Sequence, residues 1–80
     1  MSHVLNRPLA VKLRGALPLR IAMGGGWLRV KAIVEHWRET GRWWEGETEK
    51  EFYQVETERG EFILYQDRSN KNWFLYRAMD

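Results

Sequence analysis

The residues with the clearest chemical potential are cations and indoles that alternate through the middle of the chain. In proteins that bind single-stranded nucleic acid, flat rings stack on bases while Arg and Lys neutralise phosphates. The same side chains, if exposed, also suit docking onto a protein. This pattern predicts a partner-binding surface. Its candidate residues are Arg29, Lys31, Trp37, Arg38, Arg42, Trp43 and Trp44.

Two alternatives remain open for these aromatic side chains. Most of the rings could belong to the core, with the Arg side chains stacked over them. Trp43 and Trp44 are adjacent, so in an extended strand they would point to opposite faces and only one could be buried. The other would be exposed, covered by a loop, or available to a partner.

The sequence offers no recognisable group of catalytic or metal-binding residues. Ser69 has no obvious base near it in sequence, and the chain has two His and no Cys. His36 is expected to be solvated at a polar strand end. Four Glu spaced by two, at positions 45, 47, 49 and 51, are expected to be solvated charge on a surface loop. We therefore expect a protein that is not an enzyme, with no catalytic residue, no metal and no cofactor.

Length and composition set the class of protein. Eighty residues suffice for one domain, and the absence of Cys excludes disulfides. No apolar run approaches the roughly 20 residues that span a bilayer, and residues 1–10 contain no signal-like apolar stretch. We expect a cytoplasmic protein without membrane contact. Residues 1–44 carry net charge +6 and residues 45–80 carry −4, with Glu35 the first acid. Such a basic half could attract polyanions, unless the folded sheet mixes the two halves.

The elements that must position these residues are predicted to be strands. Alternating apolar residues, β-branched residues and aromatics indicate strands near 9–14, 19–23, 52–57, 62–66 and 73–79. Residues 27–38 fit both a helix and a strand, and their β-branched content favours a strand. Hairpin turns are predicted at 15–16 and 58–60, and the three glycines at 24–26 predict a flexible break. The sequence predicts an N-terminal tail over 1–6 and one all-β domain over 7–80. We expect a meander of about six antiparallel strands closing into a barrel or sandwich, with little or no helix.

The order of several residues resembles a known family. The pattern runs from Arg7-Pro8 through Trp37-Arg38, Trp43-Trp44 and Tyr53-Gln54-Val55 to Trp73-Phe74-Leu75. It is similar to a small bacterial domain of uncharacterised function. That domain is found alone or at the C-terminal end of Y-family-polymerase-like proteins of translesion synthesis. The resemblance implies an accessory role near DNA repair and no catalytic residue.

Together these features predict a non-enzymatic interaction module. The favoured hypothesis is docking onto a protein partner, such as a repair polymerase complex. The alternative is direct binding of single-stranded nucleic acid by the basic, Trp-rich face. The sequence leaves the oligomeric state open.

Overall fold

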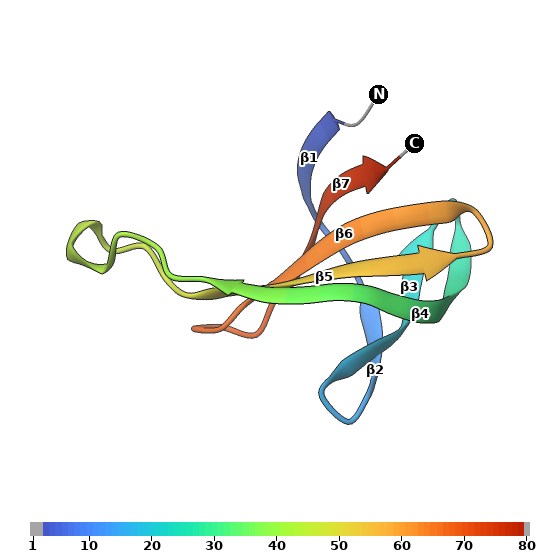
Figure 1. Cartoon of the computed structure of the whole chain (residues 1–80), viewed down its shortest axis with the longest axis horizontal. Coiled ribbons are helices and arrows are strands. Elements are labelled where there is room, and N and C mark those ends of the chain that lie inside the picture. The colour runs from blue at the N-terminus through green and yellow to red at the C-terminus, as the bar shows by residue number, and fades with distance from the viewer. Residues whose placement is uncertain (1–2, 80) are drawn as a thin grey trace.

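The protein is a single curled sheet of seven antiparallel strands. The computed structural model describes the backbone of residues 3–79, and the side chains of 5–42 and 44–79. In spatial order the sheet reads β1-β7-β6-β5-β4-β3-β2, so β1 and β2 form its edges (Figure 1). The strands are β1 (His3–Pro8), β2 (Val11–Arg14), β3 (Leu17–Met23), β4 (Gly26–Glu39), β5 (Lys50–Thr57), β6 (Gly60–Asp67) and β7 (Trp73–Met79).

The predicted all-β class is confirmed, and residues 27–38 do form a strand. The only helical element of the described chain is one 3-10 turn, η1 (Trp43–Glu45). The strand beyond the six or so expected is β1, which begins at His3 within the predicted tail over 1–6. Its alternation is hidden in the sequence because the register with β7 shifts between Val4 and Arg7, where Asn6 has a positive φ.

Two tight glycine turns set the register of β2, β3 and β4. Gly15 (φ 63°) and Ala16 connect Arg14 to its partner Leu17, as predicted for a Gly-X hairpin. Gly24 and Gly25 (φ 59° and 81°) join β3 to β4. Two successive positive φ angles define a type I′ turn, whose twist matches that of the flanking strands. The glycines therefore act as a hairpin turn rather than as a flexible break.

The inner face of the curl holds the main core. Its buried residues come from β3, β5, β6 and β7, and strands from both sides of the sheet pack around them. Such packing requires that the sheet fold over on this face, which we call the inner face. Val55, Leu64 and Leu75 are almost completely buried. The core residues are Ile21, Tyr53, Val55, Phe62, Leu64, Trp73 and Leu75.

The opposite, outer face carries a row of aromatic rings across four strands. Trp37 pairs with Phe52, Phe52 with Tyr65, and Tyr65 with Phe74. The successive ring centroids lie 5.3, 5.2 and 5.0 Å apart. Tyr76 packs edge-on against Phe52 at 5.2 Å. Aromatic pairs at these separations add stability beyond their buried area, so this row fixes the register of the sheet.

Strand β4 extends well beyond its neighbour β3. The β3–β4 ladder ends where Arg20 pairs with Arg29, while β4 continues to Glu39. The start of β3 pairs with β2 instead, and the β2–β3 hairpin diverges from β4 (Figure 1). On its other side, β4 pairs with β5 as far as Glu39. The β4–β5 connection projects beyond the rest of the sheet (Figure 1).

Candidate binding surfaces

A buried carboxylate lies at the base of the β4–β5 connection. Glu51 is only 6% exposed, although the sequence predicted solvated charge at this position. His36 Nε2 donates a hydrogen bond of 2.7 Å to Glu51 Oε2. Arg68 Nη1 lies 3.2 Å from Oε1, and Arg38 Nε lies 3.7 Å from Oε2. The His36 ring also stacks on Tyr53 at 4.5 Å. Its side chain is nevertheless 45% exposed, so it is partly solvated, as the sequence predicted.

The Glu51 carboxylate is held in its charged form. Burial alone would raise the pKa of Glu51, but the hydrogen bond from His36 and the charges of His36, Arg68 and Arg38 outweigh that effect. The pKa therefore lies below its ordinary value. The cluster ties β4, β5 and the turn after β6 together. Its partners satisfy the carboxylate from several sides, which is the arrangement of a structural ion-pair group.

Trp37 and Arg38, two of the predicted site residues, are engaged in these contacts. Trp37 is half-buried in the aromatic row, and its Nε1 donates a hydrogen bond of 3.1 Å to Glu39 Oε2. Arg38 is 62% exposed and lies between the carboxylates of Glu51 and Glu49. Trp37 therefore serves packing, as the core alternative proposed, and the charge of Arg38 is offset by its neighbours.

The segment around Arg42 forms a compact loop that contains η1. The backbone N–H groups of Glu45 and Glu47 both donate to the Arg42 carbonyl, and the Arg42 guanidinium lies 3.7 Å from Glu45. Trp44 is 67% exposed in η1, whereas the side chain of Trp43 lies outside the described residues. The condition under which Trp43 and Trp44 would point to opposite faces, an extended strand, is not met, because the backbone turns here.

The first half of β4 belongs to a different, strongly basic surface. Lys12, Arg20 and Arg29 are register partners on β2, β3 and β4, so they form one row on the same face of the sheet. All three are exposed, and within the part of the chain that the structure describes none forms an ion pair with a carboxylate. Trp27 lies two residues before Arg29 on this face and is 45% exposed.

The predicted site residues therefore do not form one surface. Arg29 and Lys31 lie in the first half of β4, and Arg38 lies at its far end. Arg38 is nine residue steps along the strand from Arg29, a distance of about 30 Å. Arg29 instead shares its face of the sheet with Lys12, Arg20 and Trp27, none of which the sequence pattern had indicated. Lys12 and Arg20 each alternate with apolar residues in a predicted strand, and this alternation was the available sequence signal. Only the register of the strands shows that these side chains lie next to Arg29.

An apolar hollow lies where β3 and β4 diverge. It measures about 360 Å³ and is lined by residues from the start of β3 and from β4 just beyond Arg29. Its walls are mainly aliphatic, its two charged lining residues are cations, and it contains no acid. Beyond the hollow, β4 has no strand on this side within the described chain. The lining residues are Arg14, Leu17, Pro18, Leu19, Val30, Lys31, Ala32 and Ile33.

The described residues form neither a metal-binding cluster nor a membrane-spanning helix. Residues 3–79 contain no cluster of three or more His, Cys, Asp or Glu arranged to hold a metal ion. In the same range, no helix has the length and apolar character needed to cross a bilayer. The features that the described surface does present are a row of cations, an exposed indole, an apolar hollow and a free strand edge.

The fold defines a small all-β domain built on one curled antiparallel sheet. Residues 4–80 match the model of a protein family described as DUF6504, a domain of unknown function. This match spans nearly the whole chain, which therefore belongs to that family. No curated protein and no solved structure matches the chain.

Proposed function

We propose that this domain is a non-enzymatic docking module that binds an extended segment of a protein partner along the free edge of β4. The observation that carries the proposal is the mismatch between β3 and β4. Residues 26–29 of β4 pair with β3, whereas residues 30–39 have no partner strand on that side among residues 3–79. The backbone N–H and C=O groups that point from this edge can pair with an added strand.

The surroundings of this edge favour a protein segment as the added strand. Val34 is 47% exposed on β4, and Leu17, also 47% exposed, lines the adjacent hollow. In strand addition, backbone hydrogen bonds supply affinity and pockets for alternate side chains supply specificity. The hollow of about 360 Å³ is large enough to receive a bulky apolar side chain of the partner.

We place this docking in DNA repair, on a translesion polymerase assembly in the cytoplasm. The support is the similarity of the residue order to domains found on Y-family-polymerase-like proteins. The predicted alternative, direct contact with nucleic acid through Arg38 and Arg42, is less favoured. Both guanidiniums lie within 4.0 Å of carboxylates.

The test is a binding measurement with a purified bacterial Y-family-polymerase-like protein. Hydrogen exchange of the labelled domain should slow at amides of residues 30–39 when the partner is added. Leu17→Lys combined with Val34→Lys should weaken binding at least tenfold, because a charged edge resists strand addition. Leu5→Lys is the matched control, since Leu5 is also exposed but lies on β1 at the other edge of the sheet.

Three results would count against the proposal. Protection confined to other strands would refute the β4 site, and so would equal loss of affinity in the Leu5 control. Sedimentation could also show that the domain forms a dimer and that the Leu17 and Val34 substitutions dissociate it. The added strand on β4 would then come from a second copy of the chain. No binding to the polymerase-like protein would remove the repair setting.

A further inference from the structure

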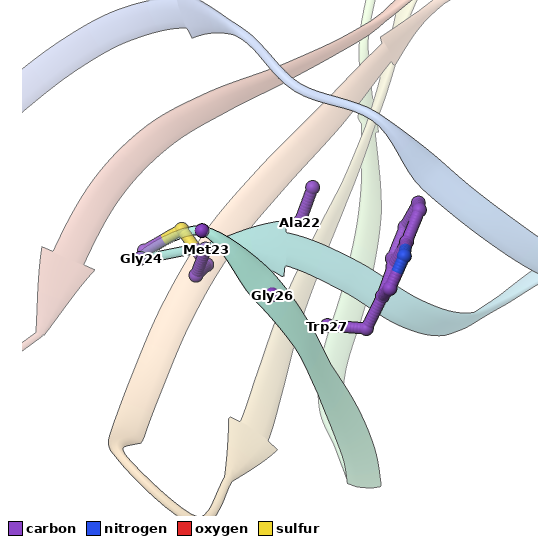
Figure 2. A pocket seen from close by; sticks show the side chains of 6 residues that line it. Ala22, Met23, Gly24, Gly26 and Trp27 are labelled. Carbon is purple, nitrogen blue, oxygen red and sulfur yellow. The ribbon is translucent and has the colours of Figure 1, made fainter.

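A shallow hollow beside Trp27 adjoins the basic row. It measures about 300 Å³ and is lined by Trp27, Ala22, Met23 and the glycines at 24–26. Figure 2 shows the Trp27 ring standing on one side of the hollow and Met23 and Gly24 on the other, with Ala22 between them. The β3–β4 turn contributes no side chain beyond Met23, so the ring has open space next to it.

The residues opposite Trp27 are small, and this keeps the ring accessible. Ala22 is the register partner of Trp27, and the Ala22 N–H donates a hydrogen bond of 3.0 Å to the Ala10 carbonyl. Across these two alanines, Lys12 Nζ reaches within 4.7 Å of the Trp27 ring centroid. A cation and an exposed indole thus lie together, although they come from β2 and β4.

Further cations lie near this hollow, besides the contact of Lys12 with the ring. Lys12, Arg20 and Arg29 form the basic row on three adjacent strands, which are about 4.8 Å apart. From the β5–β6 turn, Arg59 Nη1 lies so close to Gly24 that a Cβ there would be 2.8 Å from it. Acidic side chains follow further along the same face, where Glu56 of β5 pairs with Glu61 of β6.

We infer that this face is a binding site for single-stranded nucleic acid. Its phosphates would pair with Lys12, Arg20 and Arg29, while one base would stack on Trp27 in the hollow. An aromatic ring flanked by Arg and Lys is the arrangement that single-strand binders use, and stacking on it needs no particular base. An acidic peptide would satisfy the cations but would leave the indole and its hollow unused. The site is independent of the proposed docking edge, because neither Leu17 nor Val34, the residues substituted in the docking test, belongs to it.

The experiment is fluorescence anisotropy of a labelled short oligothymidylate titrated with the whole chain, between about 50 and 200 mM salt. Three phosphates on a single strand predict a slope of log K against log salt near −2. Arg20→Gln with Arg29→Gln should weaken binding and reduce the slope to about −0.7. Arg38→Gln with Arg42→Gln removes the same charge elsewhere and should change the affinity less than twofold, since those cations already lie beside carboxylates.

The indole is tested separately. Trp27→Leu should weaken oligothymidylate binding by about five- to 150-fold, the factor that one stacked base contributes, and Trp27→Phe should restore part of it. Circular dichroism of each variant establishes that the sheet is intact. Equal losses in the two Arg pairs, or no loss in Trp27→Leu, would overturn the site. Polyglutamate competing as well as the oligonucleotide would also overturn it and would make the row a contact for acidic proteins.

Discussion

Replacing Glu51 by Gln should destabilise the domain by about 2 kcal/mol. A hydrogen bond to a charged group contributes about 1.5–3 kcal/mol, and breaking a fully buried pair costs about 3–5 kcal/mol. Glu51 itself is buried, but the side chains of His36, Arg38 and Arg68 are 45, 62 and 41% exposed. Water can solvate these partners once the carboxylate is removed, so the lower range applies. For a domain of this size, about 2 kcal/mol corresponds to a fall in Tm of roughly 8–16 °C.

The effect should depend on pH with a defined sign. The pKa of Glu51 is lowered below its ordinary value of 4.5, so the folded state binds the proton more weakly than the unfolded state. The contribution of Glu51 to the free energy of unfolding is therefore complete above about pH 4.5. It is lost as the pH falls through the pKa of Glu51 in the folded state. In urea denaturation, the free energies of unfolding of the wild type and of Glu51→Gln should differ by the full amount at pH 7. The two values should converge in acid.

Glu49 supplies the matched control for this prediction. It lies on the same segment, is 40% exposed and approaches Arg38 only to 4.0 Å. Glu49→Gln removes the same charge and should change the stability by no more than about 0.5 kcal/mol. If both substitutions cost the same, or if the Glu51 effect persists unchanged at pH 3, the buried cluster does not stabilise the fold in the way described.

Three further predictions concern the turns, the outer face and alkaline pH. Gly25→Ala should cost about 1–2 kcal/mol in thermal denaturation because φ is 81°, whereas Gly26→Ala, without a positive φ or a near neighbour, should stay within about 0.5 kcal/mol. Phe52→Ala should cost about 3–5 kcal/mol in urea denaturation, since it removes a buried ring from the middle of the aromatic row. Burial raises the pKa of Tyr53 and of Tyr65, and nearby negative charge adds to the shift. Stability should therefore fall as the pH rises above 10, and ultraviolet difference spectra should follow the two phenols.

The all-β class could be predicted because local signals agree along most of the chain. Alternating residues in β2 and β3 and the glycines between strands specify hairpins without reference to distant contacts. The ambiguous 27–38 segment forms a strand because a tight glycine turn pairs its start with β3 and a longer connection pairs the rest of it with β5. Strand β1 escaped prediction because its bulge interrupts the alternation and because the strand with which it pairs, β7, lies at the other end of the sequence.

The candidate site was harder to predict because it depends on register and on bending. Arg29 and Arg38 were predicted to share one binding surface because they are close in sequence. They lie instead far apart on one continuous strand. The cation row instead joins Lys12, Arg20 and Arg29 from three strands. Glu51 was indistinguishable in sequence from Glu45, Glu47 and Glu49, and only the fold places it beneath His36 and Arg68.

The pairing of β1 with β7 has a consequence for the order of folding. Every other ladder joins strands that follow each other in the chain, so each can form by closing a short loop. His3 opposite Ala78 must instead bring together segments from the two ends of the chain, and the loop that closes is nearly the full length of the protein. We therefore expect a six-stranded meander to assemble first and β1 to join late. Substitutions in β1 should accelerate unfolding while leaving the folding rate almost unchanged.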